Sequence, residues 1–302
     1  MIKDFLYFIV IILSKTIIDL FRLFGSIIIF GFVLYAVSSI TRRIFAKTLG
    51  SKTEVYITGW IGTPIHELSH ALFCLIFRHK INDIKLFNTK SDTIGYVLHS
   101  YDSRSWYQQM GNFFIGVAPI IVGTLIVYFL FALLAPELEK DIFTMHLPEN
   151  RIIFNSDILS MICFGIYNMF AYAYNIFTNI INNVIDNCPF KSIAFWIFLY
   201  LSVSIASHME LSPADISHAW KGIIIIFALS LIINTFLIFI KIFLKVEIPV
   251  YIYNFINKIL DTYNMLLIFS VIISLLNFFI SYIILTPINL IRKGCLINPF
   301  SN

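Results

Sequence analysis

Residues 59–77 read GWIGTPIHELSHALFCLIF, a largely apolar stretch that contains His66, Glu67 and His70. Ionisable side chains are costly at membrane depth, and these three lie within five positions of an otherwise uncharged stretch. Because His66 and His70 are four residues apart, a helix places both imidazoles on one face. Two histidines so placed can bind one tetrahedral metal ion, with Glu67 between them as the general base. The stretch therefore predicts a catalytic zinc site.

The composition predicts a membrane protein. The chain has 302 residues, of which 59% are hydrophobic and 13% charged, and its mean hydropathy is +0.87. A soluble domain carries roughly 25% charged residues. The net charge of +4 comes from scattered side chains rather than from a basic block, so a nucleic-acid partner is not expected. We expect an integral, multi-pass protein of the lipid bilayer, located in the cell membrane.

Apolar runs long enough to cross a bilayer recur along the chain, and about 20 residues are needed for each helical span. The expected fold is all-α with about six to seven transmembrane helices. Residues 4–20 are apolar but contain Lys15 and Asp19, which fits an interfacial helix or the start of one long tilted helix. The remaining runs are expected spans, namely 24–41, 55–78, 111–134, 156–180, 191–207, 222–244 and 264–286.

A short β-hairpin is predicted between two of these helices. The β-prone runs Ile84–Phe87 and Gly95–Tyr101 are separated by a polar stretch. An extended substrate peptide could pair with such a hairpin by β-augmentation. No linker divides the chain, so residues 1–302 are expected to form one domain, with a metal-binding core of approximately 55–134 plus 191–245.

The residues around the two polar islands predict where helices begin. Thr63 suits an N-cap and Pro64 a first helical position, so the HELSH helix is expected to begin at Thr63. In residues 204–222, Ser212 and Pro213 form a second such pair, which puts Asp215 in the first turn of a helix. Since a catalytic zinc ion needs a third protein ligand, Asp215 is the predicted one.

Other polar residues are alternatives. His208 is the alternative metal ligand, and Glu210 and His218 are further rivals of Asp215. Cys74 lies four residues beyond His70 and could face the metal, although a single Cys in an apolar helix usually serves packing. Asn112 could orient a substrate carbonyl, although an interhelical hydrogen bond is its commoner role.

These features resemble the site-2 protease class of intramembrane zinc metalloproteases. That class carries HExxH in an early spanning helix and a metal-binding Asp in a later one. Here HELSH is followed by the predicted hairpin, a span rich in Gly and Asn, and the segment SPADIS with Asp215. The resemblance implies Zn²⁺ as cofactor and hydrolysis of peptide bonds in membrane-protein or membrane-associated peptide substrates.

Two other functions fit the same residues. A membrane zincin of the prenyl-protein protease kind would use Glu210 as its third ligand. A non-catalytic transporter subunit or scaffold would keep a structural or vestigial metal site.

Overall fold

The computed structural model describes residues 2–90, 93–138, 158–187, 189–245 and 249–300. The chain is largely helical, with one two-stranded antiparallel sheet. Its elements, in chain order, are α1 (Ile2–Thr48), the π-helix η1 (Val55–Gly59), α2 (Trp60–Ile76), β1 (Lys80–Lys85), β2 (Tyr96–Ser100), α3 (Trp106–Leu134), α5 (Ile158–Asn187), the 3₁₀-helix η2 (Pro189–Lys191), α6 (Ile193–Ala206), α7 (Pro213–Leu244) and α8 (Val250–Lys293).

Four helices are long and apolar enough to cross a membrane. They span Leu6–Thr48, Trp106–Leu134, Pro213–Leu244 and Asn254–Lys293. The expected six to seven spans are not confirmed among the described residues. The run 191–207 forms α6, whose 14 residues extend about 21 Å, less than the roughly 30 Å of a hydrocarbon core.

Residues 4–20 and 24–41 form one continuous helix, α1, so the first run begins a long helix and is not a separate interfacial one. The charged pair inside it has partners in the bundle. Lys15 Nζ lies 2.9 Å from Asp19 Oδ2, and Asn234 of α7 donates to the same carboxylate oxygen at 3.1 Å. Because Asp19 has both partners, the helix can continue through its charged segment.

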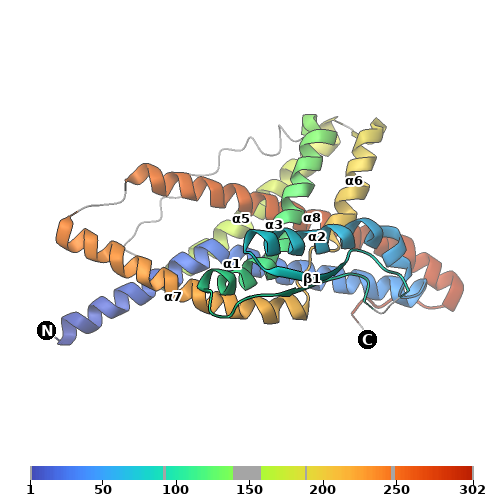
Figure 1. Ribbon diagram of the computed structural model, residues 1–302. Helices are drawn as coiled ribbons and strands as arrows, with labels where there is room; N and C mark the ends of the chain where they lie inside the picture. Colours follow the sequence, from blue (N-terminus) through green and yellow to red (C-terminus); the bar gives the residue numbers. More distant parts are fainter. Residues whose placement is uncertain (1, 91–92, 139–157, 188, 246–248, 301–302) are drawn as a thin grey trace.

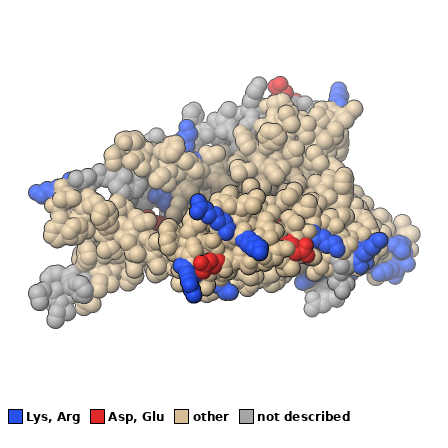
Figure 2. All heavy atoms as spheres, viewed as in Figure 1, with Lys and Arg blue, Asp and Glu red and all other residues tan. Residues whose placement is uncertain are grey.

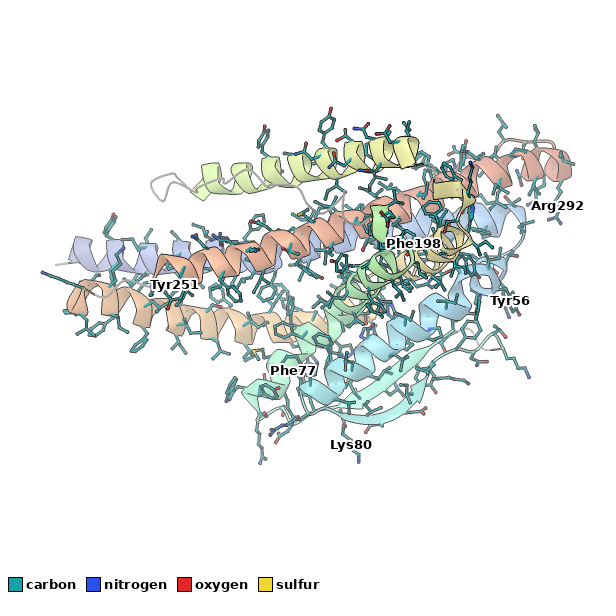
Figure 3. All side chains as sticks on the ribbon, turned by 90° about the horizontal axis from the view of Figure 1, so that it is seen from above. Tyr56, Phe77, Lys80, Phe198, Tyr251 and Arg292 are labelled. Carbon is teal, nitrogen blue, oxygen red and sulfur yellow. The ribbon has the colours of Figure 1, made fainter. Side chains whose placement is uncertain are left out.

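The long helices α1, α7 and α8 run beside one another, and α3 and α6 cross them at an angle (Figures 1 and 3). α1 packs along α8, α3 packs against α7, and α2 packs against α3. Phe131 of α3, Phe198 of α6 and Phe269 of α8 form an aromatic cluster where these helices meet, with centroid distances of 4.8–6.4 Å. This packing holds α3 and α6 in place beside α2, which carries the polar residues of the candidate site.

The face of the molecule shown in Figure 2 is mostly uncharged. Figure 2 shows charged side chains mainly along the side where Figure 1 draws β1. Large apolar side chains are exposed along α7, among them Ile232, Phe236 and Phe243. Such a continuous exposed apolar surface is typical of helices that face lipid.

The helix of the HELSH segment does not begin at Thr63, and that prediction is wrong. α2 begins at Trp60 and contains Pro64 within its second turn. A proline lacks the N–H that would bond to the carbonyl four residues earlier. The π-helical turn Val55–Gly59 lies directly upstream, and such wider turns accommodate a disturbed hydrogen-bond ladder without ending the helix.

The predicted hairpin is confirmed, although its first strand begins earlier than expected, at Lys80. Ile84 pairs with Val97 and Ile81 pairs with His99, with a register irregularity between Ile81 and Asp83. The hairpin packs against α2 and lies along its outer side in both ribbon views (Figures 1 and 3). It therefore lies beside the helix that holds the candidate site.

Candidate metal centre

His66, His70 and Asp215 come together although α2 and α7 are far apart in the sequence. The two Nε2 atoms of the histidines are 3.0 Å apart. Asp215 Oδ1 lies 3.3 Å from His70 Nε2, and its Oδ2 lies 3.9 Å from His66 Nε2. A tetrahedral metal with bonds of about 2.0–2.1 Å separates its ligand atoms by about 3.3 Å. The three side chains therefore have the spacing of a metal-binding group, which we call the His–His–Asp group.

The other nitrogen of each imidazole fixes which atom faces the group. His66 Nδ1 lies 2.6 Å from the carbonyl oxygen of His208, and His70 Nδ1 lies 2.8 Å from that of Ile115. A carbonyl oxygen only accepts, so each Nδ1 carries the proton. In the neutral rings both Nε2 atoms then carry lone pairs only 3.0 Å apart, which is repulsive unless they share a proton or converge on a bound cation. Backbone carbonyls orient metal-binding histidines in this way.

The start of α7 positions Asp215, as predicted. Ser212 is the N-cap, Pro213 occupies the first turn, and Ser212 and Asp215 form a capping box with hydrogen bonds of 2.8 and 3.1 Å. Gly116 of α3 permits the close approach of α7, because a Cβ there would lie 2.7 Å from the Asp215 carbonyl oxygen. The cap binds Oδ2 and leaves Oδ1 facing His70.

Glu67 lies beside the group and under the hairpin. Its side chain is buried, and Gly95, just before β2, is so close that a Cβ there would lie 2.8 Å from Glu67 Cγ and 2.9 Å from its Oε1.

The alternative ligands lie elsewhere. The side chain of His208 faces Glu54, with Nε2 3.5 Å from Glu54 Oε1, although its carbonyl orients His66. Glu210 forms an ion pair with Arg42 at 2.6 Å. His218 is exposed. None of the three predicted rivals joins the His–His–Asp group in the part of the chain that the structure describes.

Asn112 is fully buried on α3, one turn before Ile115. Its Nδ2 donates to the Gln109 carbonyl oxygen of the same helix at 3.1 Å. Among the described residues its Oδ1 is buried without a hydrogen-bond partner. A role for Asn112 in orienting a substrate stays a prediction.

Sequence reasoning did not identify three parts of the site, namely the carbonyls of His208 and Ile115 and the backbone at Gly95. The two carbonyls act through the main chain, so the residue types of His208 and Ile115 give no signal, and a single glycine such as Gly95 does not show which element it approaches. Tertiary packing alone brings them to α2.

Fold and site together define a largely helical protein with four candidate membrane spans and a group of possible metal ligands, of which His70 is buried and His66 and Asp215 are partly buried. Comparisons with protein-family models, with curated proteins and with solved structures found no match for this chain. The chemistry of the site is therefore inferred from its own residues.

Proposed function

We propose that the protein is a multi-pass, membrane-embedded zinc metalloprotease that hydrolyses peptide bonds of membrane-associated substrates. The observation that carries this proposal is the pair of imidazoles with Nε2 atoms 3.0 Å apart, beside the Asp215 carboxylate and next to Glu67. Two imidazoles and one carboxylate suit Zn²⁺, and three protein ligands leave a fourth position open, as catalytic zinc sites require.

Each residue has a role in this proposal. His66, His70 and Asp215 would hold the zinc ion. The ion would act as a Lewis acid toward the peptide carbonyl and would lower the pKa of a water molecule. Glu67 takes a proton from the attacking water and gives it to the leaving amine. The carbonyls of His208 and Ile115 keep both imidazoles in the tautomer that presents Nε2.

The hairpin supports a peptide substrate. Peptides often bind by adding a strand to a sheet edge, and β1 and β2 form a sheet of only two strands with mostly exposed residues in β1. Gly95, just before β2, lies against Glu67. An extended peptide paired along this sheet would pass close to the general base.

The prenyl-protein protease kind of site is disfavoured by one contact. It needs the Glu210 carboxylate as third ligand, and both oxygens of that carboxylate are engaged by Arg42, at 2.6 and 2.7 Å. A non-catalytic scaffold with a metal site would bind zinc without producing cleavage products that depend on Glu67, which the following experiment tests.

The test compares wild type with Glu67→Gln, using Glu137→Gln as a matched exposed control. Purified protein is assayed for bound zinc, and membranes of cells expressing each variant are compared by mass spectrometry of protein N-termini. We expect Glu67→Gln to keep the zinc content of wild type and to lose a set of cleavage products that Glu137→Gln retains. Zinc-free wild type, or identical cleavage products in all three proteins, would contradict the proposal.

A further inference from the structure

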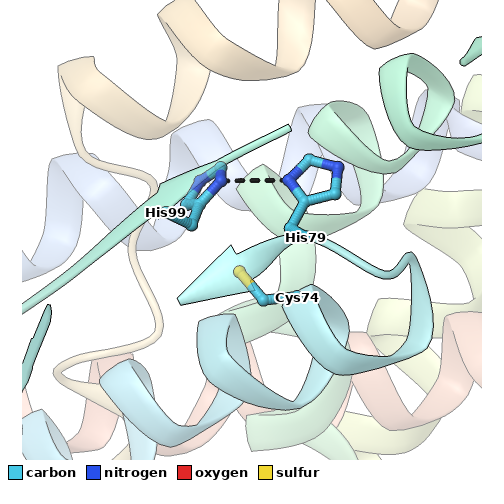
Figure 4. Close-up of side chains that lie close together, drawn as sticks. All are labelled: Cys74, His79 and His99. Carbon is cyan, nitrogen blue, oxygen red and sulfur yellow. Dashed lines mark hydrogen bonds between the residues drawn. The ribbon is translucent and has the colours of Figure 1, made fainter. Parts of the chain in front are cut away.

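A second group of metal-binding side chains lies near the end of α2. Cys74 of α2, His79 just before β1 and His99 of β2 offer ligand atoms that all lie within 4.8 Å of one another. Figure 4 shows the two imidazoles facing each other, with Nδ1 atoms 3.0 Å apart and the thiol of Cys74 nearby. We call these residues the Cys–His–His group.

The way α2 ends explains why Cys74 and His79 meet. Arg78 has a left-handed backbone, with φ of 57°. The N–H of His79 bonds to the carbonyl of Cys74 at 2.8 Å, and the N–H of Arg78 bonds to that of Leu75 at 3.2 Å. These bonds form a Schellman motif, which brings the third residue from the helix end, Cys74, into contact with the second residue beyond the C-cap Phe77, His79. Here those two residues are a cysteine and a histidine.

Sheet register and helix packing complete the group. His99 pairs with Ile81, two residues beyond His79, so antiparallel pairing returns β2 to the end of α2. Gly111 of α3 leaves room for this turn, because a Cβ there would lie 2.5 Å from Phe77 Cβ and 3.1 Å from His79 Nε2. Helix, hairpin and α3 therefore all contribute to the geometry.

A backbone carbonyl orients His79 as others orient the histidines of the His–His–Asp group. His79 Nε2 lies 2.7 Å from the Gln108 carbonyl oxygen, so Nε2 carries the proton and Nδ1 presents its lone pair to His99 and Cys74. Cys74 is fully buried and His79 is 4% exposed, whereas His99 is half-buried. The group thus combines a buried thiol with two imidazoles, of which only His99 is partly exposed.

We propose that Cys74, His79 and His99 bind a second metal ion, of the zinc class, which fastens the hairpin to the C-terminal end of α2. One thiolate and two imidazoles are ligands that Zn²⁺ prefers, with bonds of about 2.3 and 2.0–2.1 Å. The Cys74 thiol gives its proton to solvent on binding. Three protein ligands leave one position for water. The exposed ring of His218 lies near the group, with its centroid 5.9 Å from the centroid of the His99 ring.

Such an ion would act on the geometry around Glu67. Gly95 lies just before β2 and His99 is the fourth residue of that strand, so the two are four positions apart on one short segment. Slippage by one residue would reverse which face of a strand points to α2. A metal bond at His99 therefore fixes the register of β2, and with it the position of Gly95, which lies against Glu67.

The test uses Co²⁺ and Zn²⁺ with the full-length protein in detergent. A cobalt–thiolate bond gives a charge-transfer band in the near ultraviolet, which a site of two histidines and one aspartate cannot give. We expect this band in wild type and in Asp215→Ala, and its loss in Cys74→Ala. Cys295→Ala, which changes an exposed cysteine, is the matched control and keeps the band.

Zinc content separates this proposal from the proposed function. If both hold, wild type binds about two zinc ions per chain and Cys74→Ala, His79→Ala and Asp215→Ala each bind about one. One ion in wild type together with the cobalt–thiolate band would support the Cys–His–His group and contradict the His–His–Asp group. Absence of the band from wild type, or its persistence in Cys74→Ala, would overturn the second site.

Discussion

Replacement of Asp215 by Asn tests the third ligand most directly. Asp215 brings the negative charge of the His–His–Asp group, with Oδ1 3.3 Å from His70 Nε2. Asn preserves the shape of the side chain and an oxygen that can accept the hydrogen bond of the Ser212 N–H. The helix cap is therefore kept while the charge is lost.

The expected effect on zinc affinity is large. Removing one partner of a buried charge pair costs about 3–5 kcal/mol, because the remaining charge stays buried without compensation. At about 1.4 kcal/mol per tenfold, the Kd for zinc at this group should rise between about 10²-fold and 10⁴-fold in Asp215→Asn.

The assay is zinc competition against a chromophoric chelator in detergent, in a Cys74→Ala background so that only one group is titrated. His208→Ala and Glu210→Gln are the matched controls, because their side chains face Glu54 and Arg42 instead of the group. Both should keep a Kd within about tenfold of the background, below the losses of 10–100-fold that are typical of residues that orient metal ligands. If Asp215→Asn keeps the affinity while either control loses it, the assignment of the third ligand is wrong.

Two glycine substitutions probe how neighbouring elements approach α2. In Gly95→Ala the new Cβ would lie 2.9 Å from Glu67 Oε1, so the side chain of the general base must move. Formation of the cleavage products that are lost in Glu67→Gln should fall about 10²-fold, and the zinc content should stay unchanged. In Gly62→Ala the Cβ would overlap the Ser204 carbonyl oxygen. This overpacking should lower the free energy of unfolding by about 1–3 kcal/mol, measured by denaturant titration in detergent. Gly25→Ala is the control for both, because its Cβ would meet only a Phe side chain of its own helix; equal behaviour of all three variants would refute the predicted contacts.

The parts of the site that could be predicted from sequence are those fixed by local geometry. His66 and His70 share a helix face because of their spacing, and Asp215 stands in the first turn of α7 because Ser212 and Pro213 are strong start signals. The hairpin was also predictable, since two β-prone runs flank a polar stretch.

The other parts depend on tertiary contacts that leave no mark on residue type. Pro64 suggested a helix start, yet the upstream π-helical turn lets the helix continue through it. Cys74 was expected to serve packing, because nothing in its own helix shows that a left-handed residue at Arg78 and the return of β2 would place two imidazoles beside it. The span count depended on hydropathy alone, which cannot show that α6 has only 14 residues.

Glycines mark the places where the elements around the candidate site meet. Gly62 admits α6, which brings the His208 carbonyl to His66, and Gly116 admits α7 at Asp215. Lipid tails are as apolar as most side chains, so helices in a membrane gain little from burying apolar surface against each other. Close backbone approach at small residues supplies van der Waals contact instead, and it also brings main-chain carbonyls within hydrogen-bonding distance of the histidines. The same contacts that hold these helices together therefore orient the candidate metal ligands, so Ala at Gly62 should weaken zinc binding as well as the fold.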